Sequence, residues 1–209
     1  MLYPLIVSSY EGKNFILEFK DAVVVLDPET HNSAYSILKE TSKPINIIFT
    51  ADNNIELIIE LSKSFRVIAP SSTHLANSLV STYPDEKAIF ISKSVIGYFI
   101  NPPTLTKSLR PQRFVLLTTQ QLEVLYVPRI TYVEDPPPID AILTFDRILK
   151  KAENISKTPD KIPRFIGGEP QWCIAISKKD TVAPPVVYIN KKKYAVYRHM
   201  LEVVIREIE

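Results

Sequence analysis

The sequence predicts an α/β fold, namely an αββα-type sandwich with mixed β-sheets in the middle and helices on the outer faces. Two patterns support this prediction. Between residues 14 and 80, short β-branched segments alternate with helical segments, which is the order expected when helices pack on a sheet. Between residues 87 and 133 only strand-like segments occur, and proline-containing breaks at 101–103 and 109–111 separate them.

The individual elements follow from turn residues and hydrophobic periodicity. Residues 10–13 are turn-like and separate two β-branched runs, which indicates an antiparallel meander. Residues 23–26 are continuously apolar, as expected of a strand covered on both faces, and 45–49 are expected to form another buried strand. Asp52 and Asn53 are the expected N-caps of the second helix. The predicted strands are 4–9, 14–18, 22–26, 45–49, 65–69, 88–92, 95–100, 114–118, 122–127, 139–145, 162–166, 173–177 and 186–189, and the predicted helices are 32–41, 55–61, 74–79, 146–156 and 192–209.

The composition is typical of one globular domain and excludes several enzyme classes. The chain has 209 residues and a net charge of +2, so we expect a single domain, 1–209, that buries a core without disulfides or metals. Its four glycines form no dinucleotide-binding, phosphate-binding or nucleophile-elbow motif. The single cysteine excludes a disulfide framework and a thiolate zinc site. The sequence therefore predicts no cofactor.

The expected environment also follows from composition. The first residues lack the basic and apolar regions of a signal peptide, and no stretch approaches the roughly 18 apolar residues of a membrane helix. We therefore expect a cytoplasmic protein that makes no membrane contact. Seventeen prolines with one cysteine and two methionines fit a thermophile, although an unusual mesophile fits as well.

Two segments carry a resemblance to a known family. A strand pair ends in Asp27-Pro28, and the next buried strand, 45–49, ends at Thr50. This order resembles the opening of the metallo-β-lactamase fold. Residues 114–120 and 138–143 resemble two later strands of that family, but the bridging Asp between its metals is absent. The resemblance implies an αββα sandwich with its site at the ends of these strands.

The metal-binding motif of the family is missing from the sequence. In the family, the strand corresponding to 45–49 ends in Thr-His-x-His-x-Asp-His, whose His and Asp residues bind the metals. Here the segment reads Thr-Ala-Asp-Asn-Asn-Ile-Glu, so Ala51, Asn53, Ile55 and Glu56 replace these ligands. The three histidines of the chain, moreover, form no closely spaced pair. The resemblance therefore implies a degenerate member with no metal site.

Asp27, Asp52 and His74 are the candidates for a ligand pocket. Open α/β sheets bind ligands beyond the carboxyl ends of their strands, and all three residues follow predicted strands. Two alternatives stay open. Asp27 and Asp52 form the paired carboxylates of a magnesium-dependent phosphoesterase, or they only cap a turn and a helix. Cys173 lies in an apolar run, so we expect a buried structural thiol rather than a nucleophile.

The segment 190–209 is predicted to be a C-terminal helix with a cationic start. Phosphate contacts from lysine or arginine, combined with base stacking on tyrosine, are typical of nucleic-acid binding. The apolar residues of this helix also fall on one stripe, which favours burial of the tyrosines against the domain, a protein partner or a second copy of the chain. The nucleic-acid-binding candidates are Lys191, Lys192, Lys193, Tyr194 and Arg198.

These observations predict a pseudoenzyme: a non-catalytic protein that serves as a binding or scaffolding module. No residue is assigned a catalytic role. The alternatives are a nucleic-acid-binding accessory protein that uses the C-terminal cationic segment, and a phosphoesterase that uses Asp27 and Asp52.

Overall fold

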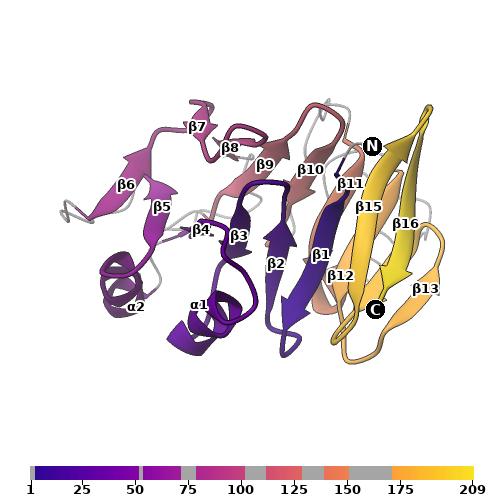
Figure 1. The fold of residues 1–209 in the computed structure, drawn as a ribbon, viewed down its shortest axis with the longest axis horizontal. Coiled ribbons are helices and arrows are strands. Elements are labelled where there is room, and N and C mark those ends of the chain that lie inside the picture. The colour runs from indigo at the N-terminus through magenta and orange to yellow at the C-terminus, as the bar shows by residue number, and fades with distance from the viewer. Residues whose placement is uncertain (1–2, 52–53, 72–78, 102–111, 129–138, 151–170) are drawn as a thin grey trace.

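The computed structural model describes residues 3–51, 54–71, 79–101, 112–128, 139–150 and 171–209. They form two eight-stranded mixed sheets (Figure 1). The first sheet has the order β16-β15-β1-β2-β3-β4-β5-β6, and the second has the order β13-β14-β12-β11-β10-β9-β8-β7. The helices are α1, His31–Leu38, and α2, Ile55–Ser62. The strands are β1, Leu5–Tyr10; β2, Asn14–Glu18; β3, Val23–Leu26; β4, Ile45–Ile48; β5, Arg66–Pro70; β6, Val80–Tyr83; β7, Ile89–Phe90; β8, Ile96–Ile100; β9, Phe114–Thr118; β10, Glu123–Tyr126; β11, Ala141–Phe145; β12, Trp172–Ile176; β13, Thr181–Ala183; β14, Val186–Ile189; β15, Lys193–His199; and β16, Glu202–Ile208.

The predicted sandwich is confirmed by the way the core divides into layers. The largest apolar cluster lies between the two sheets and contains residues of both, such as Phe15 and Leu17 from β2 with Val115 and Leu117 from β9. A second cluster joins the outer face of the first sheet to α1 and α2, and Figure 1 shows α1 near β3 and α2 below β5. A third cluster covers the outer face of the second sheet and includes Leu149 from the helical residues 146–150.

The pairing of the strands sets the edge at which their carboxyl ends gather. β1, β2 and β3 form the predicted antiparallel meander, and β3, β4, β5 and β6 then run parallel. In the second sheet β10, β11, β12 and β14 are also parallel. Because Asp27 after β3 contacts Tyr126 at the end of β10, the carboxyl ends of both parallel groups lie at the same edge of the sandwich. We call it the strand-end edge.

The predicted C-terminal helix is wrong. Its residues form the antiparallel strands β15 and β16, and β15 pairs with β1 at the margin of the first sheet. The apolar residues that suggest a helical stripe also alternate with the period of a strand, so that Tyr194 and Val196 both enter the core. Met200 has a φ of 55° and forms the tight turn between the two strands. The surface expected for a partner is therefore a hairpin.

Smaller differences concern single elements. The strands β6 and β13 are absent from the sequence-based assignment, since β6 is short and all three residues of β13 are exposed. Asn54, rather than Asp52 or Asn53, caps α2, because its Oδ1 accepts the N–H of Leu57 at 3.1 Å. The predicted strand 162–166, the predicted helix 74–79 apart from Leu79, and residues 151–156 of the predicted helix 146–156 lie outside the described residues.

Candidate functional site

Asp27 is the carboxylate placed at the strand-end edge by the end of β3. Its backbone has a φ of 43°, and its N–H donates to the carbonyl of Ile48 at 2.9 Å, which fixes the residue against β4. Thr50 follows β4 and binds the carboxylate twice: its N–H donates to Oδ1 at 2.8 Å and its hydroxyl donates to Oδ2 at 2.6 Å. The side chains of Tyr126 and Gln112 also hydrogen-bond to Asp27. We call these four residues the Asp27 cluster.

Burial has the largest effect on the pKa values of Asp27 and Tyr126 in the Asp27 cluster. Asp27 as a whole residue is half-buried, but its carboxyl group lies deep among protein atoms, and this burial raises its pKa above the usual range. The hydrogen bonds from Thr50, Tyr126 and Gln112 favour the charged form and oppose part of the rise. Burial, followed by the nearby Asp27 charge, raises the pKa of Tyr126 well above its usual value. The Tyr126 hydroxyl therefore stays protonated at neutral pH.

The hydrogen bonds of Asp27 join the ends of two strands. An ionised carboxylate has about four lone-pair positions for acceptance. The Thr50 N–H and the Thr50 hydroxyl occupy one position on each oxygen, and the nearby Tyr126 and Gln112 side chains also favour the charged form. The carboxylate therefore holds the ends of β3 and β4 together, beside Tyr126 of β10.

The other two candidates for the ligand pocket are Asp52 and His74. Both lie outside the described residues, so a pocket built from Asp27, Asp52 and His74 stays a prediction. Among the residues that the structure does describe, no group of three His, Cys, Asp or Glu side chains is arranged to hold a metal ion. The described donor set therefore does not fit the metal centre that the fold would otherwise imply.

A hollow of about 460 Å³ opens at the strand-end edge beside the cluster. It lies between the β1–β2 turn and the ends of β11, β12 and β14. Its walls carry charges of both signs, and the Arg147 guanidinium stacks on the Phe145 ring at 4.9 Å from the centroid. The charged lining residues are Glu11, Lys13, Glu29, Asp146, Arg147 and Lys178.

The cationic candidates of the C-terminal segment are largely engaged with the protein itself. Lys192 pairs with Glu207 at 2.8 Å and Lys193 pairs with Glu40 at 3.3 Å, both at the surface. Lys191 presents its ammonium to solvent, while its backbone N–H donates to Asp180.

The other two residues of that set contact the body of the fold. Arg198 forms an ion pair with the buried carboxylate of Asp140, which also accepts the N–H of Glu123 at 2.8 Å. Tyr194 is 1% exposed and belongs to the core between the sheets, so its ring is not available to stack on a base. The structure brings these residues together on one hairpin, but as parts of the fold.

The sequence reasoning missed Tyr126 and Gln112 as partners of Asp27. Gln112 stands alone before β9, and nothing in its surroundings marks it. Tyr126 is an aromatic residue in an apolar strand, where its hydroxyl was the one available signal, since a buried tyrosine hydroxyl needs a partner. Cys173 is buried as expected, and burial raises the pKa of its thiol to about 12, which keeps it protonated.

Several solved structures are similar to this architecture, although the sequence itself has no match. No protein-family model and no curated protein matches the sequence. The metallo-β-lactamase fold protein YhfI from Bacillus subtilis is similar in structure, with a TM-score of 0.57 over 98% of this chain and 100% of that chain, at 9% identity. The chain has the metallo-β-lactamase fold.

Two further structures with this fold are similar over most of the chain. Igni18, a metallo hydrolase from the hyperthermophilic archaeon Ignicoccus hospitalis, gives a TM-score of 0.57 at 9% identity and covers 98% of this chain and 99% of its own. CmlA, a diiron β-hydroxylase from Streptomyces venezuelae, gives 0.51 at 11% identity over 85% of this chain. The chain spans 45% of the length of CmlA. At these identities the likeness shows the fold alone. Within the described part of the chain, no helix is both long and apolar enough to cross a membrane.

Proposed function

We propose that this protein is a non-catalytic member of the metallo-β-lactamase fold, a pseudoenzyme that acts as a binding or scaffolding module. One observation carries the proposal. Asp27, the carboxylate that follows β3 at the strand-end edge, accepts a hydrogen bond on each of its two oxygens from Thr50, and no group of three His, Cys, Asp or Glu side chains among the described residues is arranged to hold a metal ion beside it. We infer that Asp27 holds the ends of β3 and β4 together rather than binding a metal.

The residues around Asp27 support the same conclusion. A hydrolytic zinc site needs three or four His, Asp or Cys ligands that converge on the ion and leave a position for water. Position 51 is occupied by a buried alanine, and position 55 by an isoleucine at the start of α2, where the resemblance expects ligands. The hollow of about 460 Å³ next to the cluster leaves room at the same edge for a bound molecule.

Metal analysis combined with a hydrolase assay tests this proposal. The purified full chain is dialysed against zinc, manganese or iron, washed, and analysed by elemental mass spectrometry, and hydrolysis of bis(p-nitrophenyl) phosphate is measured with and without magnesium. We expect well under one metal ion per chain and no hydrolysis above the buffer rate. The same measurements are made on Asp27→Asn and on the matched control Asp21→Asn, a carboxylate held by Ser92 and Ser94 at the other end of β3.

The outcome that overturns the proposal is specific. Near-stoichiometric metal that is lost in Asp27→Asn but kept in Asp21→Asn would make Asp27 a ligand. Magnesium-dependent hydrolysis with the same pattern would establish the phosphoesterase alternative. Circular dichroism of both variants separates these results from simple unfolding.

The nucleic-acid alternative has its own test, because the hairpin still carries three consecutive lysines. Binding of a fluorescein-labelled oligonucleotide is measured between 50 and 300 mM salt for the wild type and for Lys191→Ala/Lys192→Ala/Lys193→Ala. Since Lys192 and Lys193 already pair with glutamates, we expect weak binding that this triple substitution barely changes. Tight, salt-sensitive binding that the substitution abolishes would favour the alternative.

A further inference from the structure

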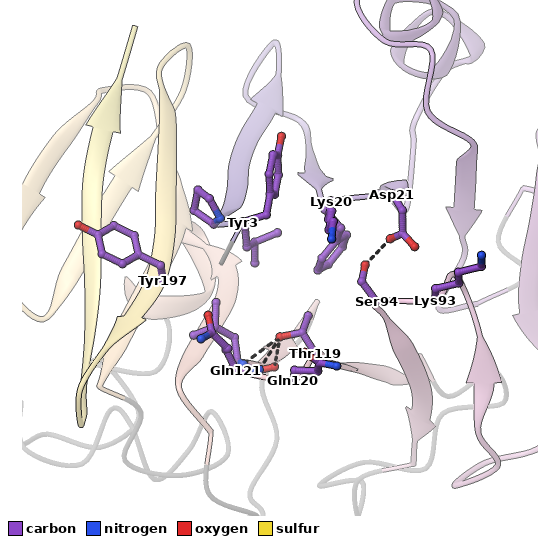
Figure 2. A pocket seen from close by; sticks show the side chains of 13 residues that line it. Tyr3, Lys20, Asp21, Lys93, Ser94, Thr119, Gln120, Gln121 and Tyr197 are labelled. Atoms are coloured by element: carbon purple, nitrogen blue, oxygen red, sulfur yellow. Dashed lines mark hydrogen bonds between the residues drawn. The ribbon is translucent and has the colours of Figure 1, made fainter. Parts of the chain in front are cut away.

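A cavity of about 500 Å³ lies at the end of the sandwich opposite to the strand-end edge. Figure 2 shows its lining. It is formed by the start of β1, the β2–β3 turn, the β7–β8 turn and the β9–β10 turn, with Tyr197 of β15 beside them. β3 begins next to this cavity and ends at Asp27, so the length of a strand separates the two sites. We call it the turn-side cavity.

The inner wall of the turn-side cavity is apolar and aromatic. Leu5, Phe19 and Leu122 line it, and each is less than 5% exposed and belongs to the core between the sheets. Tyr3 adds an aromatic ring at the mouth and is 43% exposed. A molecule with a flat apolar body contacts this wall, and the apolar surface removed from water is mostly its own and that of Tyr3.

Tyr3 is held in place before any ligand arrives. Lys43 lies over its ring at 4.5 Å from the centroid and donates to its hydroxyl at 3.0 Å. The same hydroxyl donates to Glu18 at 3.2 Å, and Lys43 also pairs with Glu18 at 2.7 Å. Because the ring is already ordered, binding against it loses little conformational entropy.

The rim of the cavity carries an excess of positive charge. Two lysines, Lys20 and Lys93, and one carboxylate, Asp21, contribute to the lining. Asp21 accepts hydrogen bonds from the hydroxyls of Ser92, at 2.8 Å, and Ser94, so neutral groups of the protein satisfy it. Within the residues that the structure describes, neither Lys20 nor Lys93 forms a salt bridge. An anionic ligand thus meets cations that have no competing partner.

The facing side of the cavity is polar and uncharged. Figure 2 shows Lys20 and Tyr3 on one side of the opening and the turn Thr119–Gln121 on the other. The Thr119 hydroxyl accepts the backbone N–H groups of Gln121 and Leu122, at 3.2 and 2.9 Å, which fixes this turn. The Gln120 and Gln121 side chains remain available as donors to an oxygen of a ligand.

We propose that the turn-side cavity is a binding site for a small aromatic carboxylate. The flat ring packs on Leu5, Phe19 and Leu122 beside Tyr3, and the carboxylate lies toward Lys20, with the glutamine amides on the facing side of the cavity. A volume of about 500 Å³ suits a molecule of one or two rings. The proposal concerns the opposite end of the molecule from the Asp27 cluster and does not depend on whether the strand-end edge has lost catalysis.

Calorimetric titration of the full chain tests the site with 2-naphthoate as the probe. The neutral analogue 2-naphthalenemethanol has the same ring system without the charge. For 2-naphthoate we expect a Kd in the range of about 10 to 300 μM, as befits a ligand with few polar contacts. The alcohol should bind at least about five-fold more weakly, because it gains nothing from the lysines.

Three variants locate the binding. Lys20→Gln removes the cation at the rim and should weaken 2-naphthoate about two- to five-fold while leaving the alcohol unchanged. Gln121→Trp fills the cavity with a side chain, and only the backbone of Gln121 hydrogen-bonds within the described structure, so we expect binding to be lost without unfolding. Lys179→Gln is the matched control, an exposed lysine outside the cavity, and should bind like the wild type.

Several results would overturn the proposal. They are no heat of binding for 2-naphthoate at millimolar concentration, equal affinity for the acid and the alcohol, and equal losses in Lys20→Gln and Lys179→Gln. Should Gln121→Trp fail to fold, the acid–alcohol comparison and the two lysine variants still decide. A metal found in the strand-end edge would overturn the proposed pseudoenzyme and leave the turn-side cavity untouched.

Discussion

Replacing Thr50 by valine tests the view that Asp27 is a structural residue. Thr50 is fully buried, and its hydroxyl donates to Asp27 Oδ2 at 2.6 Å. Valine has nearly the same shape, so the substitution removes one donor from the carboxylate and leaves no cavity. The backbone N–H of residue 50 continues to donate to Oδ1.

The size of the effect follows from the chemistry of the lost bond. A hydrogen bond to a charged group contributes about 1.5 to 3 kcal/mol, and a buried charge that loses a donor is left with part of its desolvation cost. We therefore expect Thr50→Val to reduce the free energy of unfolding by about 2 kcal/mol at pH 8. In a protein of this length that corresponds to a fall in Tm of roughly 4 to 8 °C.

The pH dependence of the effect has a definite sign. Burial raises the pKa of Asp27 above its unfolded value, so the folded state favours the protonated form. The stability contributed by this group is complete below the unfolded pKa of about 3.9 and is lost as the pH rises through the folded pKa. Loss of the Thr50 hydroxyl raises the folded pKa further, so the cost of Thr50→Val should grow with pH.

A double-mutant cycle provides the assay. Urea unfolding of the wild type, Thr50→Val, Asp27→Asn and the double variant is followed by circular dichroism between pH 5 and pH 8. We expect a coupling energy of about 1 to 2 kcal/mol at pH 8, because Thr50→Val costs much less once residue 27 is neutral. A coupling below about 0.3 kcal/mol, or a cost of Thr50→Val that is the same at every pH, would refute the reasoning.

Three further predictions concern single residues. Partial burial tends to raise the pKa of Asp180, but the N–H groups of Asn190, Lys192 and Lys191 outweigh this effect and lower the pKa. Asp180→Asn should therefore reduce the free energy of unfolding by about 1 kcal/mol at pH 7, measured by urea unfolding. This difference should disappear as the pH falls below about 4. Gly12 has a φ of +67°, and an added Cβ would meet Asn190 Oδ1 at 2.7 Å, so Gly12→Ala should lower the Tm by roughly 3 to 8 °C in calorimetry. Cys173, with a pKa of about 12, should react with Ellman's reagent at least about 100-fold more slowly in the native state than in urea, and rapid native labelling would contradict its burial.

The central strands could be predicted from the sequence because their apolar pattern fits a strand buried on both faces and not a surface helix. β3 consists of four apolar residues, and β4 has three isoleucines around Asn46; all residues of both strands are buried, and such a pattern fits no surface helix. The predicted β3 strand places Asp27 at its end. The hydrogen-bond partner of Asp27 could not be predicted, because a carboxylate after a strand can cap the local turn or contact the next strand. Only the register of β3 on β4 brings Thr50 within hydrogen-bond distance.

The C-terminal segment shows why other strands could not be predicted from the sequence. A spacing of three and four residues between apolar side chains is compatible with a helix, and the same segment also places Tyr194 and Val196 two apart, as in a strand. What decides between them is the unpaired edge of β1, which accepts β15 along Leu5–Val7. That edge is created by residues nearly the whole chain away, and a local pattern carries no information about it.

The pairing of β1 with β15 also orders events during synthesis of the chain. Leu5 and Val7 leave the ribosome long before their partners Val196 and Tyr194. Until then one edge of β1 is open, with apolar side chains that later enter the core, and such an edge invites pairing with other chains. Nascent chains stalled before β15 should therefore depend on chaperones that cover β1, and release from them coincides with closure of the first sheet.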